Sequence, residues 1–305
     1  MTARVYFEMW LSQQKYILRP STYEALEVYF GVHIIPFFQD YELEDIKAIH
    51  IQQYVNQKLS PCGRADGSGP LSLVSVRKHL SLLRQSLNNA VVLDLIPINP
   101  ALAVKLSKNK QKIRREVFMN ITQANKMLEA MNGTYIYPIV AITLMYGLRR
   151  SEILGLKWSA VDFDNDTISI EHTVVKNRKI HYEDSVKSES SYRVYQLLPE
   201  IKQLLLSLSR NGEYIFSWPD GTVYRPDSVT RMFQRAVQKC GFPKMRFHDL
   251  RHSTASILFD MGWSLEDVKN WLGHADIETT SNIYLHYSND RRKLLGDQLQ
   301  GVFKL

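Results

Sequence analysis

Residues 146–158 read YGLRRSEILGLKW, and this stretch decides how the second half of the chain is expected to fold. Gly147 is typical of a helix end, and a new helix should begin near Ser151, so Arg149 is predicted to lie at a helix junction. There its guanidinium group would present two parallel donors to a phosphate. Glu152, three residues later, would hold that group in place. The alternative is an ordinary surface ion pair.

A histidine and an arginine share the next motif, FHDLRHSTAS. His248 and Arg251 are three positions apart, which places them on one face of a predicted helix. Both side chains would then reach a single phosphate. Taken alone, H-x-x-R is a weak pattern that occurs by chance in many proteins.

The third motif, WLGHADIETTSNIYLHY, supplies a phenol. Gly273 is predicted to end a helix and to leave His274 at the turn, and Tyr284 follows ten residues later on the next helical segment. A lone tyrosine in such a place is more often a core or surface aromatic residue. His286 and Tyr287 compete with it for any role.

The fourth motif, VKSESSYR, contains a lysine in or beside a strand turn. Lys187 is the candidate, with Lys157, Lys176 and Lys179 as nearby alternatives that spacing alone does not exclude. An ordinary solvated lysine is the competing interpretation.

Around these motifs the second half is predicted to alternate helices with a few strands. Residues 167–175 and 178–186 carry β-branched and aromatic residues, and the polar pair between them predicts a hairpin; residues 192–198 predict a third strand. Helices are expected in PEIKQLLLSLSR, DSVTRMFQRAVQK, HDLRHSTASILFDM, LEDVKNWLG, which Ser264 would cap, and IETTSNIYLHY.

The part of the chain before residue 105 is predicted to be helical. Ser21 and Glu24 have the spacing of a capping box, so a helix is expected to begin there. Between residues 75 and 92, apolar residues recur at three- and four-residue steps and predict a buried stripe. Its members are Val76, Leu80, Leu83, Leu87 and Val91. The stretch SPCGRADGSGP is predicted to be an exposed loop.

A basic segment divides the chain into two predicted domains. KLSKNKQKIRRE has six Lys and Arg residues and almost no apolar ones. We place the boundary there, with domains at 1–105 and 117–305 joined by a linker at 106–116. A solvated tether and a DNA-contacting segment are both consistent with this composition.

Composition limits the class of protein. The 305 residues include 38 Lys and Arg against 31 Asp and Glu, for a formal charge of +7 and a pI near 9.2, which suits a polyanionic partner. Two distant cysteines, Cys62 and Cys240, indicate neither a disulfide framework nor a zinc site. With no apolar leader and no membrane-length apolar run, we expect a soluble, cytoplasmic protein.

Four segments of the second half, in their order and rough spacing along the chain, resemble the tyrosine recombinases, or phage-type integrases. GLRRSEILGL, HDLRH, LGH and the run from Thr280 to His286 carry the resemblance, and K-S-x-x-S-x-R, ending at Arg193, looks like a further family segment. The resemblance covers essentially the whole chain. It implies a helical, SAM-like core-binding domain followed by a mainly α catalytic domain with a small antiparallel β-sheet and a C-terminal tail from about residue 291.

Residue roles follow from the resemblance. Glu152 would orient Arg149, and Arg150 matches a variable position expected to be solvated. The implied catalytic residues are Arg149, Lys187, His248, Arg251, His274 and the nucleophile Tyr284.

The resemblance implies site-specific cleavage and rejoining of double-stranded DNA through a 3′-phosphotyrosyl intermediate, without metal or cofactor. Four protomers would assemble on two duplexes, with accessory DNA-bending or directionality factors as possible partners, and integration or excision of a mobile element is the expected role. The apolar steps in the tail fit docking either on a neighbouring protomer or on its own domain. The alternatives are a type IB topoisomerase-like activity and a non-catalytic DNA-binding regulator.

Overall fold

In the computed structural model the chain divides into two compact units, Met1–Ile113 and Arg114–Leu305. The structure describes residues 1–106, 118–176, 179–183 and 192–273. The division falls inside the segment predicted to be a linker, and the domain bounds given above stay predictions. Within the described ranges, no helix is both long enough and apolar enough to cross a membrane.

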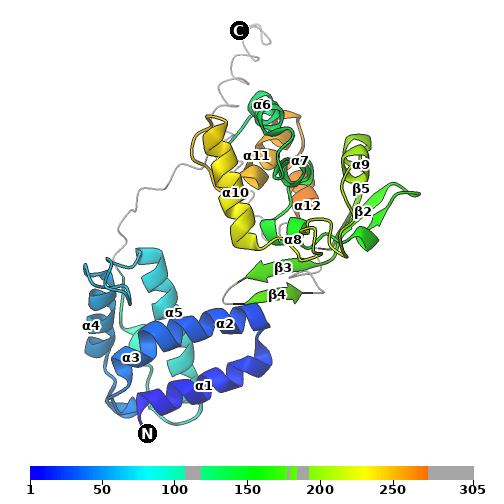
Figure 1. Ribbon diagram of the computed structural model, residues 1–305. Helices are drawn as coiled ribbons and strands as arrows, with labels where there is room; N and C mark the ends of the chain where they lie inside the picture. The colour runs from blue at the N-terminus through cyan, green and yellow to red at the C-terminus, as the bar shows by residue number, and fades with distance from the viewer. Residues whose placement is uncertain (107–117, 177–178, 184–191, 274–305) are drawn as a thin grey trace, which may run out of the picture. The chain divides into compact units, whose positions relative to one another are not determined.

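All the described elements of the first unit are helices or helical turns (Figure 1). Its core is rich in aromatic rings. The ring of Phe30 contacts those of both Phe7 and Trp10. Its elements are α1 (Ala3–Ile17), α2 (Pro20–Val28), a π-helical turn (Tyr29–Ile34), α3 (Ile35–Phe38), α4 (Ala48–Leu59) and α5 (Leu73–Val92), with 3₁₀ turns at Leu43–Asp45 and Pro100–Leu102.

The apolar stripe predicted for α5 is confirmed, because four of its five members are buried and Val91 packs against the same core from a partly buried position. The predicted capping box is wrong. Helix α2 begins at Pro20, with Arg19 as N-cap, and Ser21 and Glu24 lie buried within the helix. Proline at the first helical position needs no N–H partner and already has the helical φ angle. The helix therefore begins at Pro20, before Ser21 can act as its N-cap.

The second unit combines seven described helices with two small antiparallel sheets that lie at the edge of the helices (Figure 1), in agreement with the predicted fold class. Helix α7 is buried on nearly every side, which explains its uniformly apolar sequence. The helices are α6 (Ile121–Met131), α7 (Tyr137–Tyr146), α8 (Arg150–Leu154), α9 (Pro199–Leu206), α10 (Pro226–Lys239), α11 (Phe247–Asp260) and α12 (Leu265–Leu272), with a 3₁₀ turn at Trp158–Ala160.

The strands correct one prediction. Residues 167–175 form two strands, β2 (Thr167–Ile170) and β3 (Thr173–Lys176), which belong to different sheets. β2 lies between β1 (Val161–Asp162) and β5 (Arg193–Gln196), whereas β3 forms the predicted hairpin with β4 (Ile180–Glu183). The extended strand is interrupted at His172. Its carbonyl group packs against Gly155, where a Cβ atom would lie only 2.2 Å from the carbonyl oxygen. The end of α8 therefore separates the two strands.

The end of α7 brings three helices together. Gly147 has a left-handed φ of 65° and caps α7, as predicted. A Cβ atom on Gly147 would lie 2.2 Å from Leu272 Cδ2 in α12 and 3.4 Å from Thr254 Cγ2 in α11. Thr254 Oγ1 also donates to the carbonyl of Leu144, 2.9 Å away. The chain that leaves α7 is thus packed directly against α11 and α12.

We predict that Gly147→Ala destabilises the protein more than Gly133→Ala does. Both glycines have positive φ, but no atom of the described residues lies within 4 Å of a Cβ atom on Gly133. Gly133→Ala should lower the free energy of unfolding by about 1–2 kcal/mol, the cost of a left-handed L residue. Gly147→Ala should lower it by a further 1–3 kcal/mol or so through overpacking. Urea denaturation measures both, and equal losses would contradict the packing described for α7.

Candidate active site

Arg149 lies at the helix junction predicted for it, as the N-cap of α8. Its backbone N–H donates to Glu152 Oε2 at 2.8 Å, and its Nη1 donates to Glu152 Oε1 at 2.5 Å. Its Nη2 donates to the carbonyl of Gly273 at 3.0 Å. About a third of the side chain is exposed. The contact expected from the three-residue spacing is therefore present, and the carboxylate fixes the direction of the guanidinium group.

Glu152 is the centre of a buried charge cluster. Its side chain is 2% exposed. Besides Arg149, it accepts a hydrogen bond from Arg193 Nη2 at 2.9 Å, and Arg251 Nη1 lies 3.8 Å away. Burial by itself would raise the pKa of Glu152, but the charges of Arg193, Arg149 and Arg251 outweigh it and hold that pKa below its ordinary value. Glu152 is consequently an anion at neutral pH.

Arg251 comes from α11 and is almost completely buried. Its side chain is 1% exposed; Nη1 donates to the carbonyl of Gly147 and Nη2 to that of Leu272, both at 2.7 Å. Burial, and then the neighbouring charge of Arg149, lower the pKa of Arg251 to about 9, which leaves it protonated at neutral pH. Three guanidinium groups thus share one carboxylate, so the cluster has an excess of positive charge.

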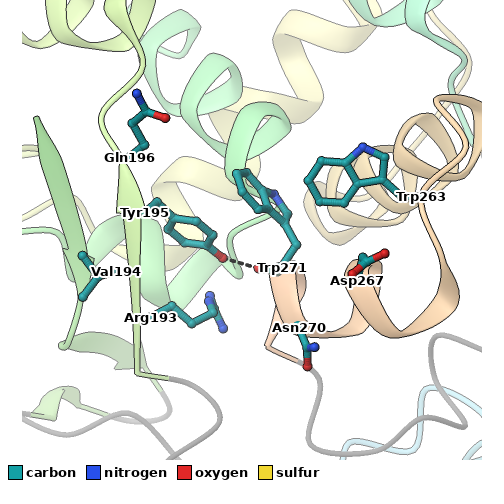
Figure 2. A pocket seen from close by; sticks show the side chains of 8 residues that line it. All are labelled: Arg193, Val194, Tyr195, Gln196, Trp263, Asp267, Asn270 and Trp271. Atoms are coloured by element: carbon teal, nitrogen blue, oxygen red, sulfur yellow. Dashed lines mark hydrogen bonds between the residues drawn. The ribbon is translucent and has the colours of Figure 1, made fainter.

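The end of α12 is fastened to this cluster. The carbonyl oxygens of residues 271–273 have no partners within their own helix, as at any helix C-terminus. In chain order they accept hydrogen bonds from the Tyr195 hydroxyl, Arg251 Nη2 and Arg149 Nη2. Figure 2 shows the first of these contacts. Gly273 ends the helix with a φ of 64°, as predicted.

His248 lies one turn before Arg251 on α11 and is exposed. Its ring meets that of His252 edge to face, with centroids 4.7 Å apart. Desolvation of the ring by the surrounding protein lowers the pKa of His248 to about 4, and the charges of His252, Arg251 and Arg149 lower it further. The pattern H-x-x-R therefore brings a neutral imidazole to the edge of the arginine cluster.

Three predicted site residues lie outside the described residues: Lys187, His274 and Tyr284. Of the alternative lysines, Lys176 pairs with Asp227, and Lys157 pairs with Glu213 at 2.9 Å. Both pairs use carboxylates other than Glu152.

Two arginines behave differently from what the sequence suggested. Arg150 was expected to be solvated, but it is partly buried and its Nη1 donates to Thr230 Oγ1 at 2.6 Å, because the first turn of α8 faces α10. Arg193 was noted only as the last residue of the K-S-x-x-S-x-R segment, with no role predicted. It is the first residue of β5 and donates a hydrogen bond to Glu152. The available signal was the alternation of β5, in which residues 193 and 195 face inward.

An open groove of about 660 Å³ adjoins the cluster. Figure 2 shows Arg193 extending from β5 toward α12, beside Tyr195 and Trp271. The groove is lined on one side by residues 193–196 of β5 and on the other by Trp263, Asp267, Asn270 and Trp271.

The chain matches known families over most of its length. A model described as the phage integrase family matches residues 117–291, and one described as the phage integrase N-terminal SAM-like domain matches residues 2–59. A tyrosine recombinase XerC-like protein of Caldanaerobacter subterraneus is 26% identical, over 94% of this chain and 80% of the relative. The ICEBs1 integrase of Bacillus subtilis is 24% identical, over 93% and 78%.

Solved structures share the fold. The Tn1549 transposon integrase in complex with transposon right end DNA has a TM-score of 0.79 at 20% identity, covering 99% of this chain and 100% of that one. A lambda integrase tetramer bound to a Holliday junction has a TM-score of 0.65 at 17% identity, covering 90% and 78%.

We predict that Glu152→Gln strongly destabilises the second unit. The change leaves buried guanidinium groups without their counter-charge, which typically costs about 3–5 kcal/mol of unfolding free energy. The control is Glu213→Gln, because Glu213 is 64% exposed in its pair with Lys157 and such pairs contribute about 0–1 kcal/mol. Denaturant unfolding near neutral pH measures both, and a loss for Glu152→Gln no larger than the control would refute the central role of this carboxylate.

The same carboxylate sets a pH dependence. The pKa of Glu152 is lower in the folded chain than its ordinary value of 4.5. Its ionisation therefore stabilises the folded chain above that value, and this stabilisation is lost as the pH falls through the folded pKa. The stability difference between the parent and Glu152→Gln should therefore shrink on acidification below about pH 4.5. A difference that is constant with pH would contradict this.

For His248 we predict an imidazole that stays neutral at pH 6 in the DNA-free protein. Its folded pKa of about 4 lies below the ordinary histidine value of 6.5, so the unfolded chain binds the proton first, and stability falls as the pH drops from 6.5 toward 4. Side-chain ¹⁵N chemical shifts, assigned with His248→Gln, measure this directly. A titration midpoint near 6.5 would show that the ring is not in the environment described.

Proposed function

The chain belongs to the phage integrase family, and on that premise we propose that it cuts and rejoins DNA by transferring a scissile phosphate to the hydroxyl group of Tyr284. It is a tyrosine-type site-specific DNA recombinase. The observation that carries the proposal is the buried cluster in which Arg149 and Arg251 are aligned around Glu152. A cluster with excess positive charge suits a phosphodiester, which is an anion.

The chemistry explains this arrangement. Attack of the phenol oxygen on phosphorus forms a pentacoordinate transition state with more negative charge than the ground state, and preorganised cations stabilise that extra charge. The bond between phosphorus and the 5′ oxygen then breaks. The products are a 3′-phosphotyrosyl link and a free 5′ hydroxyl group, and attack by the 5′ hydroxyl of a partner strand reverses the reaction. We assign Arg149, Arg251 and His274 to the phosphate.

Two proton transfers complete the step. A free phenol has a pKa near about 10 and needs a base close by. His248 suits this role because its lowered pKa keeps it neutral at pH 7. The departing 5′ oxygen needs a proton, which we assign to Lys187 as general acid. Neither transfer needs a metal ion or a cofactor.

The proposed substrate is double-stranded DNA at specific recombination sites, and the proposed assembly is four protomers on two duplexes. Structural relatives are integrases bound to DNA, and one is a tetramer on a Holliday junction. The relatives named for a transposon and for ICEBs1 support integration or excision of a mobile element as the role. Such a reaction would take place in the bacterial cytoplasm or nucleoid, with accessory DNA-bending or directionality factors as further partners.

Topoisomerase-like religation of the same strand is less well supported, because the named relatives are recombinases and integrases. A non-catalytic regulator is also less well supported, because a chain that only binds DNA has no need to bury three arginines around one carboxylate.

We predict that Tyr284→Phe abolishes covalent attachment to DNA. The parent protein should form a DNA–protein adduct on nicked suicide duplexes drawn from a pool that includes the ends of the genetic element carrying the gene. A denaturing gel detects the adduct. An undiminished adduct with Tyr284→Phe would exclude this nucleophile, and no adduct from a parent protein that binds the duplex would favour the regulator.

Arg149→Ala should slow cleavage about 100- to 1000-fold, the usual loss when one preorganised donor to the transition state is removed. The control is Arg150→Ala, which removes the same charge from the adjacent position, where the side chain binds Thr230. Its cleavage rate should stay within a few-fold of the parent. Single-turnover rates at saturating DNA separate chemistry from binding, and equal effects of the two changes would reduce Arg149 to a general source of charge.

A further inference from the structure

We propose that Arg193 is a positioning residue for strand cleavage, which shares the carboxylate of Glu152 so that Arg149 and Arg251 remain available to the DNA phosphate. This inference rests on the proposed function. Arg193 is 8% exposed, and its described contacts are with Glu152 and with the Tyr195 ring, so we assign it to the carboxylate and not to the phosphate. It acts through the one carboxylate that all three guanidinium groups approach.

The division of hydrogen bonds carries the argument. Glu152 Oε1 accepts only from Arg149 among the bonds described, whereas Oε2 accepts from the Arg149 backbone and from Arg193. Arg251 Nη1 lies 3.8 Å from the same Oε2 and donates instead to the carbonyl of Gly147 at 2.7 Å. Arg193 thus occupies the position on Oε2 that Arg251 would otherwise take.

Loss of Arg193 would redirect its neighbours. An ionised carboxylate with an open acceptor site attracts the nearest cation strongly in a buried environment. Arg251 Nη1 would turn from the Gly147 carbonyl toward Glu152. Nη2 would then lose its alignment with the carbonyl of Leu272, to which it now donates at 2.7 Å. The positive charge of Arg193 beside Glu152 would be lost as well, so the carboxylate would neutralise more of the charge of Arg149 and Arg251.

A purely structural ion pair accounts less well for Arg193. Its Nε and Nη1 are buried and have no hydrogen-bond partner among the described residues, and each unmet donor costs free energy. Its guanidinium carbon lies 5.7 Å from the centre of the Tyr195 ring, which compensates only in part. Buried ion pairs can often be replaced by apolar residues without loss of stability. The presence of a costly arginine at this buried position fits a role in orienting the phosphate-binding groups.

The test uses single-turnover cleavage of the suicide duplex at saturating DNA by Arg193→Ala and Arg193→Lys, with the folded fraction measured at the assay temperature. Arg193→Ala should cleave about 10- to 100-fold more slowly, by analogy with the loss found when residues that orient metal ligands are removed, while binding DNA as the parent does. Arg210→Ala is the matched control, because Arg210 stacks on Trp158 and Phe163 in the same unit and should cleave at the parent rate.

Chemical rescue makes the test specific. Added guanidinium ion should fill the buried space left in Arg193→Ala and restore the cleavage rate several-fold, whereas urea, which has a similar shape without charge, and sodium chloride at equal ionic strength should not. A parent protein without adduct overturns the proposed function itself. A parent that forms the adduct, together with an Arg193→Ala variant that cleaves at the parent rate, or whose loss follows its unfolded fraction and is not rescued, overturns the role of Arg193.

Discussion

The second unit depends on a negative charge held away from water. Glu152 is buried, and a carboxylate in such a place stays ionised only if cations and hydrogen-bond donors surround it. Those groups come from the start of α8, the start of β5 and the middle of α11. Any shift of one element would expose or unpair the charge. A single acidic side chain therefore fixes three elements that are far apart in the sequence.

The same cluster fastens a fourth element. Arg149 and Arg251 each divide their donors between groups inside the site and the carbonyls that end α12. The last turn of α12 is thus held by the groups proposed to bind the phosphate, and residue 274 follows directly. The hydrogen bonds that align the two arginines therefore also fix the position of Gly273, after which the sequence leads to Tyr284.

Local signals in the sequence predicted much of this arrangement. The glycines at 147 and 273 end their helices, and the three-residue spacings place Arg149 beside Glu152 and His248 beside Arg251, because these relations involve one turn of backbone. Features set by distant contacts were missed. The break between β2 and β3 depends on the end of α8, and the environments of Arg150 and Arg193 depend on α10 and on Glu152. The start of α2 was misplaced because Pro20 outweighs the spacing of Ser21 and Glu24.

The closed ring of contacts from Gly147 to Gly273 has a consequence for protein engineering. Arg251 binds the carbonyls of Gly147 and Leu272, Arg149 binds that of Gly273, and Leu272 fills the space beside Gly147. A chimera of two family members that joins within this interval would bring together arginines, helix ends and an apolar neighbour that were never packed with one another. Exchange of DNA-recognition or assembly modules should therefore use junctions before residue 147 or after residue 273, so that the interval is inherited as one block.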